Sequence, residues 1–392
     1  MPVQTGLDCL IAEEFESLRG KRVGLLCNQA SIAGDLTHAV DRFYQAHRRG
    51  IIRLMALFGP QHGLWGHTQD NMIEWQGYDD RRLQLPVHSL YGEHRKPTPE
   101  MLQGLDVLVV DLQDVGAKYY TFIWTMALCM EACAEQGVEV MVLDRPNPLN
   151  GTALEGPACN REFLSFVGLH PLAIRHGMTI GEIARYFREH FYPGVSLTVM
   201  TMRGWHREMF FEDTALPWAM PSPNMPTPDT ARVYPGMCLL EATNISEGRG
   251  TTRPFEMFGA PWIDGWAVAE ALRQYDLPGA VFRPLQFQPT FHKYCGEVCG
   301  GCFIHLTDRE AFQPFKTAIA LLREIIRRYP EHFRWKQPPY EYEYEKMPFD
   351  ILVGNDWLRA MLEEQRPLPE MEARWQEETG WFENLRKAWL LY

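Results

Sequence analysis

Two carboxylates and an amide directly follow a run of aliphatic residues in the first third of the chain. Asp111, Gln113 and Asp114 come after residues 107–110, Val-Leu-Val-Val, which are typical of a strand buried on both faces of a parallel sheet. In open α/β sheets, ligands bind beyond the carboxyl ends of the strands. These side chains therefore predict one wall of a binding cleft, although Asp114 could equally cap the helix expected from about residue 120.

Polar side chains also follow three further expected strands, at 21–27, 52–58 and 138–143. In that order they are Asn28, then Gln61 and His62, then Asp144, Arg145 and Asn147. Because the carboxyl ends of parallel strands share one edge of a sheet, about 5 Å apart, we expect these groups to converge. Any one of them could simply form a turn or cap a helix. As a set they predict a polar cleft that suits a ligand with many hydroxyls, such as a sugar.

A second candidate stretch is 246–253, Ser-Glu-Gly-Arg-Gly-Thr-Thr-Arg. It places Glu247 beside Arg249 and Arg253 in a loop whose glycines let backbone amides approach a ligand closely. No Lys-Ser/Thr pair follows, as a phosphate loop would need, and residues 28–31 stand where a dinucleotide fingerprint would follow the first strand. The sequence therefore predicts no nucleotide cofactor.

Three cysteines raise the question of a metal. Cys295, Cys299 and Cys302 have the spacing of an iron–sulfur or zinc site, and His292 and His305 are close in sequence. The triplet lies late in the chain, however, and Cys302 begins a strand-like run. We therefore expect no metal and no other cofactor. Gly-x-Ser-x-Gly and His-Glu-x-x-His are absent, so neither a nucleophile-elbow hydrolase nor a zinc protease is supported.

Size and charge limit the class of protein. A chain of 392 residues exceeds the length at which one core keeps growing, so two domains are expected. The net charge of −12 argues against nucleic-acid and membrane surfaces as partners and leaves a small molecule, with a monomer and a homodimer both open. No signal peptide or long apolar run is visible, and the nine cysteines are scattered through apolar segments. We expect a cytoplasmic protein with reduced thiols.

Strands alternate with helices through residues 21–150, which predicts βαβ units. The expected fold is α/β, a Rossmann-like and mostly parallel sheet with helices on both faces, and Thr179 with Glu182 forms a capping box for a later helix. Five prolines between 217 and 228 predict a stiff crossing between domains. We divide the chain into a Rossmann-like domain at 1–220 and a smaller α+β domain at 221–392, with a strand at 301–306 and a helix at 311–329.

Several short motifs, taken in order, resemble those of a known family. They are Pro-Gln-His-Gly at 60–63, Ser-Leu-Tyr-Gly at 89–92, Asp-Leu-Gln-Asp-Val-Gly at 111–116, Leu-Asp-Arg-Pro-Asn-Pro at 143–148, Pro-Ser-Pro-Asn-Met-Pro at 221–226 and Ser-Glu-Gly-Arg-Gly-Thr at 246–251. From about Gly6 to the C-terminus the chain resembles the exo-β-N-acetylmuramidases, the NamZ-like glycoside hydrolases. The resemblance implies two domains with the active site between them, and release of N-acetylmuramic acid from the non-reducing end of peptidoglycan fragments.

Gln61 departs from the family pattern, because many members have glutamate there and that glutamate is their favoured catalytic acid. A carboxamide cannot exchange a proton in this way. Glycoside cleavage takes two carboxyl groups, or one acid and a carboxylate that orients the sugar's own acetamido group. We therefore predict that Glu247 or Asp114 carries the proton, with Asp111 as a further catalytic candidate. The alternative is an amino-sugar-binding homologue that is inactive or has altered specificity.

The lactyl carboxylate of muramic acid would bind a bidentate cation, for which Arg145, Arg249 and Arg253 are candidates. The other residues predicted to bind the substrate are Asn28, Gln61, His62, Gln113, Tyr120, Asp144, Asn147, Asn224 and His292.

Overall fold

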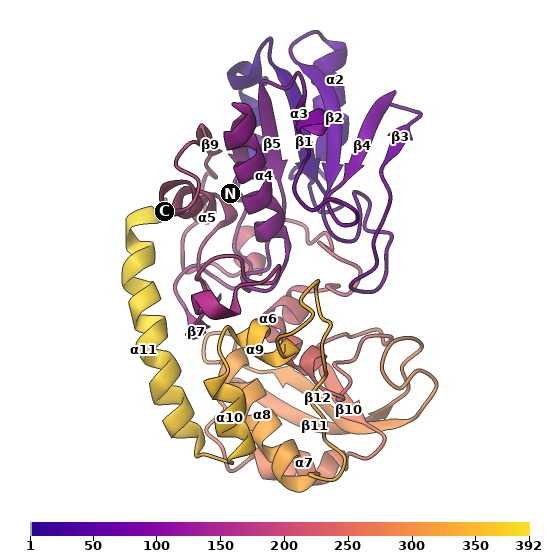
Figure 1. Ribbon diagram of the computed structural model, residues 1–392, viewed down its shortest axis with the longest axis vertical. Helices are drawn as coiled ribbons and strands as arrows, with labels where there is room; N and C mark the ends of the chain where they lie inside the picture. Colours follow the sequence, from indigo (N-terminus) through magenta and orange to yellow (C-terminus); the bar gives the residue numbers. More distant parts are fainter. Residues whose placement is uncertain (1) are drawn as a thin grey trace.

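A seven-stranded sheet forms the centre of the first domain in the computed structural model, which describes residues 2–392 (Figure 1). Its order is β3-β4-β2-β1-β5-β6-β9. The bounds are β1 Arg22–Cys27, β2 Arg53–Gly59, β3 Tyr78–Asp80, β4 Leu85–Ser89, β5 Val107–Asp111, β6 Glu139–Leu143 and β9 Leu197–Met200. All pairs are parallel except the edge pair of β3 and β4. The parallel strands follow the 3-2-1-4-5-6 order of the Rossmann fold, which confirms the predicted fold class.

The helices that flank this sheet are α1 Gly6–Ala12, α2 Ala39–Arg48, α3 Pro99–Leu102, α4 Phe122–Gln136 and α5 Ile180–His190. The predicted capping box of α5 is confirmed. The Thr179 hydroxyl accepts a hydrogen bond from the Glu182 amide, and the Glu182 carboxylate accepts one from the Thr179 amide. This cap fixes the start of α5 beside the end of β6 and so helps to position the loop that follows β6.

The second domain contains a three-stranded antiparallel sheet in the order β10-β12-β11. Its elements are α6 Pro228–Met237, β10 Met257–Ala260, α7 Gly265–Leu272, β11 Ala280–Phe287, β12 Cys299–Leu306, α8 Pro314–Arg328, α9 Pro348–Val353 and α10 Trp357–Glu363. Gly301 allows the strands to approach closely, because a Cβ there would overlap the carbonyl of Phe258. The predicted strand at 301–306 and helix at 311–329 are confirmed within a few residues by β12 and α8.

The chain returns from the second domain to the first through α11, Leu368–Arg386 (Figure 1). α11 packs on β7 Glu155–Ala158, which forms a two-stranded sheet with β8 Ala173–Arg175. Arg386 donates to the Gly151 carbonyl at 2.8 Å, and the hydroxyl of Tyr392 donates to Asp144 at 2.7 Å. The final segment therefore packs against the first domain. The predicted division at residue 220 assigns this segment to the second domain instead.

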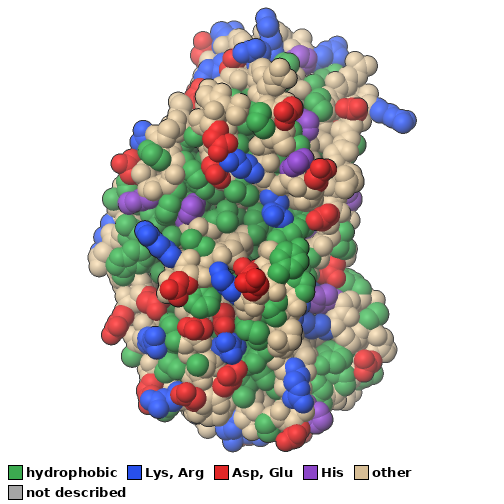
Figure 2. All heavy atoms as spheres, in the orientation of Figure 1, with side chains coloured by type: hydrophobic (Ala, Val, Ile, Leu, Met, Phe, Trp, Pro, Cys, Tyr) green, Lys and Arg blue, Asp and Glu red, His purple; other side chains and the backbone are tan. Residues whose placement is uncertain are grey.

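The surface carries both signs of charge. Acidic and basic side chains alternate over the face in Figure 2 without a patch of one sign. Of the helices formed by residues 2–392, none combines the length and the apolar character needed to cross a bilayer.

Candidate active site

The four strands whose ends carry the predicted polar groups are neighbours in the sheet, in the order β2, β1, β5 and β6. Cys27 at the end of β1 lies opposite Asp111 at the end of β5. The groups therefore share one edge, as the sequence predicts. Their contacts divide them into two sets, one bonded within the protein and the other lining a cavity.

The first set is centred on a buried ion pair. Arg145 donates to both carboxylate oxygens of Asp111, at 2.5 and 2.8 Å, and to the carbonyl of Ile32 at 3.0 Å. Both charged side chains are buried. The guanidinium and the carboxylate thus neutralise each other. Through these bonds Arg145, which follows β6, joins the end of β5 to the loop after β1.

Three amide side chains at the same edge hold loops in place. Each donates to a backbone carbonyl: Asn28 to Pro221 at 2.7 Å, Gln113 to Pro146 at 2.9 Å and Asn147 to Met178 at 2.9 Å. These hydrogen bonds occupy the amide groups of three side chains that the sequence predicts to bind the substrate.

Asp144 is also bonded within the first domain. Its carboxylate accepts from the Tyr392 hydroxyl at 2.7 Å, the Thr179 hydroxyl at 2.8 Å and the Gly181 amide at 2.8 Å. Burial raises the pKa of Asp144 to about 7, although these donors oppose the shift. Its contacts join the end of β6 to α5 and to the C-terminal residue.

Asp114 lies in the turn that leads from β5 to α4. Its carboxylate accepts from the Gly116 amide at 2.7 Å and lies 3.1 Å from Nε2 of His176. Both side chains are buried, and neither lines the cavity described below.

Glu247 is surrounded by basic side chains. Lys293 lies 2.8 Å from its carboxylate, His292 3.3 Å and Arg249 3.4 Å. Burial raises the pKa of Glu247, but the nearby charges of Lys293 and Arg249 and the hydrogen bond with His292 outweigh burial and hold it well below its usual value. Glu247 therefore carries a negative charge at neutral pH. Arg253 is farther out, half-exposed, and paired with Glu256 at 3.1 Å.

A small cavity lies where the two domains meet, and residues of both domains form its wall. Of the predicted residues it is lined by Gln61, His62, Tyr120, Asn224 and Arg249. Sequence reasoning missed other polar residues in its wall, which include Asn71, Thr121, Glu241, Tyr340 and Glu341.

The loop after β2 supplies a neutral imidazole. The Nδ1 of His62 lies 2.8 Å from the Thr68 carbonyl and donates its proton there, because a carbonyl only accepts. Burial lowers the pKa of His62 to about 4. The Nε2 atom is therefore an acceptor at neutral pH. His62 has a φ of 71°, an uncommon conformation that the surrounding loop imposes.

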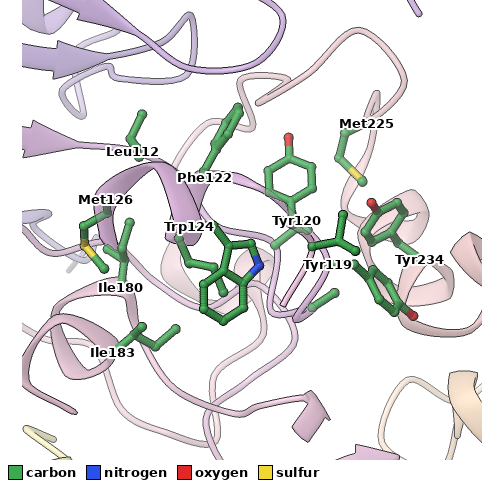
Figure 3. Close-up of a cluster of buried hydrophobic side chains, with 14 of the residues drawn as sticks. Leu112, Tyr119, Tyr120, Phe122, Trp124, Met126, Ile180, Ile183, Met225 and Tyr234 are labelled. Atoms are coloured by element: carbon green, nitrogen blue, oxygen red, sulfur yellow. The ribbon is translucent and has the colours of Figure 1, made fainter. Parts of the chain in front are cut away.

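An aromatic wall comes from both domains. Tyr119 and Tyr120, which precede α4, lie beside Met225 and Tyr234 of the second domain (Figure 3). The rings of Tyr120 and Tyr234 are edge to face with centroids 5.9 Å apart. The buried hydroxyl of Tyr120 has Ser222 as a polar neighbour in the cavity wall but makes no hydrogen bond of good geometry within residues 2–392. That hydroxyl is a candidate group for binding a ligand.

Glu241 and Arg249 form a second polar wall. The carboxylate of Glu241 accepts from Arg249 at 2.8 Å, from the Tyr340 hydroxyl at 2.7 Å and from the Asn71 amide at 2.8 Å. Nη1 of Arg249 is buried and makes no hydrogen bond within residues 2–392, and the carboxylate of Asp70 lies 3.9 Å from it. One nitrogen of the guanidinium therefore remains for an anionic group.

Glu341 is the second carboxyl group in the cavity wall. The Tyr91 hydroxyl donates to Glu341 at 2.8 Å, and the amide of Gln61 donates at 3.4 Å. Thr121 donates to the Gln61 carbonyl oxygen at 2.6 Å, which orients the amide nitrogen toward Glu341. Burial raises the pKa of Glu341 to about 7, against the opposing effect of the Tyr91 hydrogen bond.

The cysteine triplet is part of the second domain's sheet. Cys299 and Cys302 are buried in β12, with the Cys302 thiol 3.3 Å from the Gly265 carbonyl, and Cys295 is exposed. Over residues 2–392, no three His, Cys, Asp or Glu side chains come together in a way that could hold a metal ion.

Comparisons with known proteins cover the whole chain. The family models for the N-terminal and C-terminal parts of the exo-β-N-acetylmuramidase NamZ match residues 23–229 and 232–392. The peptidoglycan β-N-acetylmuramidase NamZ of Bacillus subtilis strain 168 is 44% identical over 390 residues, 100% of this chain and 91% of that protein.

Two solved structures of DUF1343 family proteins from Bacteroides fragilis share the fold. They have TM-scores of 0.89 and 0.78 and identities of 32% and 28%, and each match covers 100% of this chain and 99% of the other. The chain therefore belongs to the NamZ family of exo-β-N-acetylmuramidases.

Proposed function

We propose that the protein is an exo-acting glycoside hydrolase that releases N-acetylmuramic acid from the non-reducing end of peptidoglycan fragments. The observation that carries this proposal is the cavity between the domains, whose wall contains two carboxyl groups, Glu241 and Glu341, beside a guanidinium. Glycoside hydrolysis is the chemistry for which such a pair of carboxyl groups is used. The B. subtilis relative is named for the same reaction.

The groups without protein partners supply the recognition. Nη1 of Arg249 binds the lactyl carboxylate, the feature that distinguishes muramic acid from glucosamine. The hydroxyl of Tyr120 binds one sugar hydroxyl, since it can both donate and accept a hydrogen bond. Nε2 of His62 accepts a hydrogen bond from another sugar hydroxyl. The tyrosine rings offer apolar surface to the face of the sugar.

The catalytic roles predicted for Glu247, Asp114 and Asp111 stay predictions, and their contacts favour supporting roles. Glu247 is ionised and holds Arg249 and Lys293 in place from behind the cavity wall. Asp111 is neutralised by Arg145, and Asp114 contacts His176 instead of the cavity. These carboxylates would position the substrate-binding loops without exchanging a proton with the substrate.

We propose that the substrates are small fragments met in the cytoplasm. All nine cysteines are free thiols, and only Cys295 is exposed. Free thiols persist in a reducing compartment. Cell fractionation with an antibody to the protein would test the location, and recovery outside the cytoplasmic fraction would contradict it.

A panel of chromogenic glycosides tests the activity. The purified protein should release para-nitrophenol from the N-acetyl-β-muraminide and leave the N-acetyl-β-glucosaminide nearly intact. It should also release free N-acetylmuramic acid from N-acetylmuramyl-N-acetylglucosamine and not cleave the reversed disaccharide. Binding of N-acetylmuramic acid without turnover of either substrate would instead support the sugar-binding alternative.

A further inference from the structure

Glu341 reaches the cavity from a tight turn of the second domain. The turn is closed by two backbone hydrogen bonds of 2.9 Å between Tyr340 and Glu343. Glu341 has a φ of 44°, in the left-handed region that is unfavourable for a non-glycine residue. The turn holds this conformation and delivers the carboxyl group to Gln61 and Tyr91 of the first domain.

The surroundings of Glu341 differ from those of the other acidic side chains near the cavity. It is 4% exposed, it forms no ion pair with a described residue, and its two donors, Tyr91 and Gln61, are both neutral. Glu241 and Glu247, in contrast, each lie close to the guanidinium of Arg249. A carboxyl group buried among neutral donors retains its proton more readily than one beside a cation.

Glu341 also lies between two cavities. It lines the cavity already described and a second, more open one that includes Arg95, Phe166 and Tyr342. The guanidinium of Arg95 lies over the Tyr342 ring at 3.7 Å and over the Phe166 ring at 5.6 Å. An acid that protonates a glycosidic oxygen must stand between the sugar that is cut off and the sugar that leaves.

We propose that Glu341 is the general acid of this glycosidase and that Tyr91 and Gln61 are positioning residues for its carboxyl group. The inference rests on the proposed function. The N-acetylmuramic acid unit occupies the cavity between the domains, and the leaving sugar lies over Arg95. This assigns the proton transfer to a residue of the second domain, although the first domain supplies most of the predicted candidates.

The proton balance of the reaction is complete with water as the co-substrate. The protonated Glu341 donates its proton to the glycosidic oxygen while the bond from that oxygen to the anomeric carbon breaks, and the second sugar leaves as an alcohol. The oxygen of a water molecule then forms the new bond to the anomeric carbon. The proton that this water loses restores the acid form of Glu341.

Substitution Glu341→Gln, assayed on two leaving groups, tests the proposal. General acid catalysis contributes about 10²–10⁴-fold, so kcat on the disaccharide should fall by that factor. The leaving group of the para-nitrophenyl muraminide departs with little help from an acid, so kcat on this substrate should fall about tenfold or less. Binding of N-acetylmuramic acid, measured by calorimetry, should be retained. Glu345→Gln, two residues beyond the turn and exposed, is the matched control and should behave as the unsubstituted protein.

A second variant, which keeps the packing of the ring, covers the case in which Glu341→Gln does not fold. Tyr91→Phe removes the hydrogen bond that lowers the pKa of Glu341, so the fall of kcat/KM on the alkaline side should move to higher pH. The unsubstituted protein should lose activity as pH rises through about 7.

Three results would overturn the assignment. The first is Glu341→Gln cleaving the disaccharide as fast as the control. The second is equal losses of kcat on both leaving groups. The third is a Tyr91→Phe profile that coincides with that of the unsubstituted protein. Each of these results can be interpreted only if the unsubstituted protein cleaves the disaccharide. If it does not, the proposed function fails, which is a separate outcome.

Discussion

Two polar regions lie along the carboxyl edge of the same sheet and differ in how their groups are satisfied. Around Asp111 and Arg145 the donors and acceptors pair with each other and with backbone carbonyls. In the cavity between the domains, Nη1 of Arg249 and the Tyr120 hydroxyl make no hydrogen bond of good geometry within the described chain, although Nη1 lies 3.9 Å from Asp70, and the hydrogen-bond donors of Glu341 are neutral. Because buried polar groups are normally paired, we propose that the ligand binds in the second region.

The comparison also shows where this Rossmann-like fold departs from the usual position of a ligand. Such folds bind ligands where the strand order reverses, here between β1 and β5. At this position Arg145, paired with Asp111, lines a separate small pocket together with Gln113. The cavity instead begins with Gln61 and His62 after β2 and depends on the second domain for its other wall.

The largest expected effect is on stability around the Asp111–Arg145 pair. Arg145→Met leaves Asp111 buried without its cation, so the free energy of unfolding should fall by about 3–5 kcal/mol in urea titrations. Arg273→Met, which breaks the exposed pair with Glu270, should change it by about 1 kcal/mol or less. A folded Arg145→Met protein that has lost binding of N-acetylmuramic acid would instead place this region in the site.

The next effect concerns the pH dependence of stability. The pKa of Glu341 rises from 4.5 to about 7 on folding, so its protonated form stabilises the native state fully below pH 4.5. That contribution is lost as pH rises through about 7 and amounts to about 3 kcal/mol. Glu341→Gln should therefore gain stability relative to the unsubstituted protein between these pH values, measured by urea denaturation. A constant difference across this range would show that Glu341 is not held protonated.

A smaller effect is expected on substrate discrimination. Arg249→Lys keeps the charge, but the single ammonium group cannot bond Glu241 and the lactyl carboxylate with the fixed geometry of the guanidinium. The preference for the muraminide over the glucosaminide should therefore fall about 10–100-fold in kcat/KM, the range of a hydrogen bond to a charged group. Arg253→Lys is the matched control, because Arg253 pairs with Glu256 outside the cavity. Equal loss on both glycosides would assign Arg249 to catalysis or to the fold instead of to the lactyl group.

The smallest effect is expected in the second cavity. Arg95→Ala removes the cation that lies over Tyr342 and Phe166, so KM for the disaccharide should rise by roughly 2–5-fold, in keeping with about 0.5–1 kcal/mol for an exposed contact. The para-nitrophenyl muraminide lacks the second sugar, so its KM should stay unchanged. A parallel rise in both values would contradict a role in binding the leaving sugar.

The first domain could be predicted because its strands carry long apolar runs. All five residues of β5 are buried, and only a strand covered on both faces has such a sequence. β11 in the second domain was not predicted, because its eight residues are all partly or fully exposed and their polarity follows no clear alternation. β3 is three residues long and lies at the edge of the sheet, so its sequence resembles a loop.

The candidate site could be predicted only in part. Gln61, Tyr120 and Arg249 lie in motifs that sequence reasoning selected, and all three line the cavity. Glu341 belongs to the alternating run Glu-Tyr-Glu-Tyr-Glu at 341–345, which reads as a solvated surface. Glu341 is buried by the first domain while Glu345 remains exposed. Nothing local distinguishes these glutamates, since the difference arises from contacts about 250 residues away in sequence.

The two crossings of the chain restrict how a substrate can enter. The proline-containing stretch at 217–228 joins the domains in one direction, and α11 returns to bond Gly151 and Gly156 of the first domain. Rotation of the domains about a single hinge would break the contacts of α11. We therefore expect sugar to enter and leave through displacement of the turn at 340–343 and of the loop that carries Asn71, both of which contribute to the cavity wall, and not through rotation of the domains.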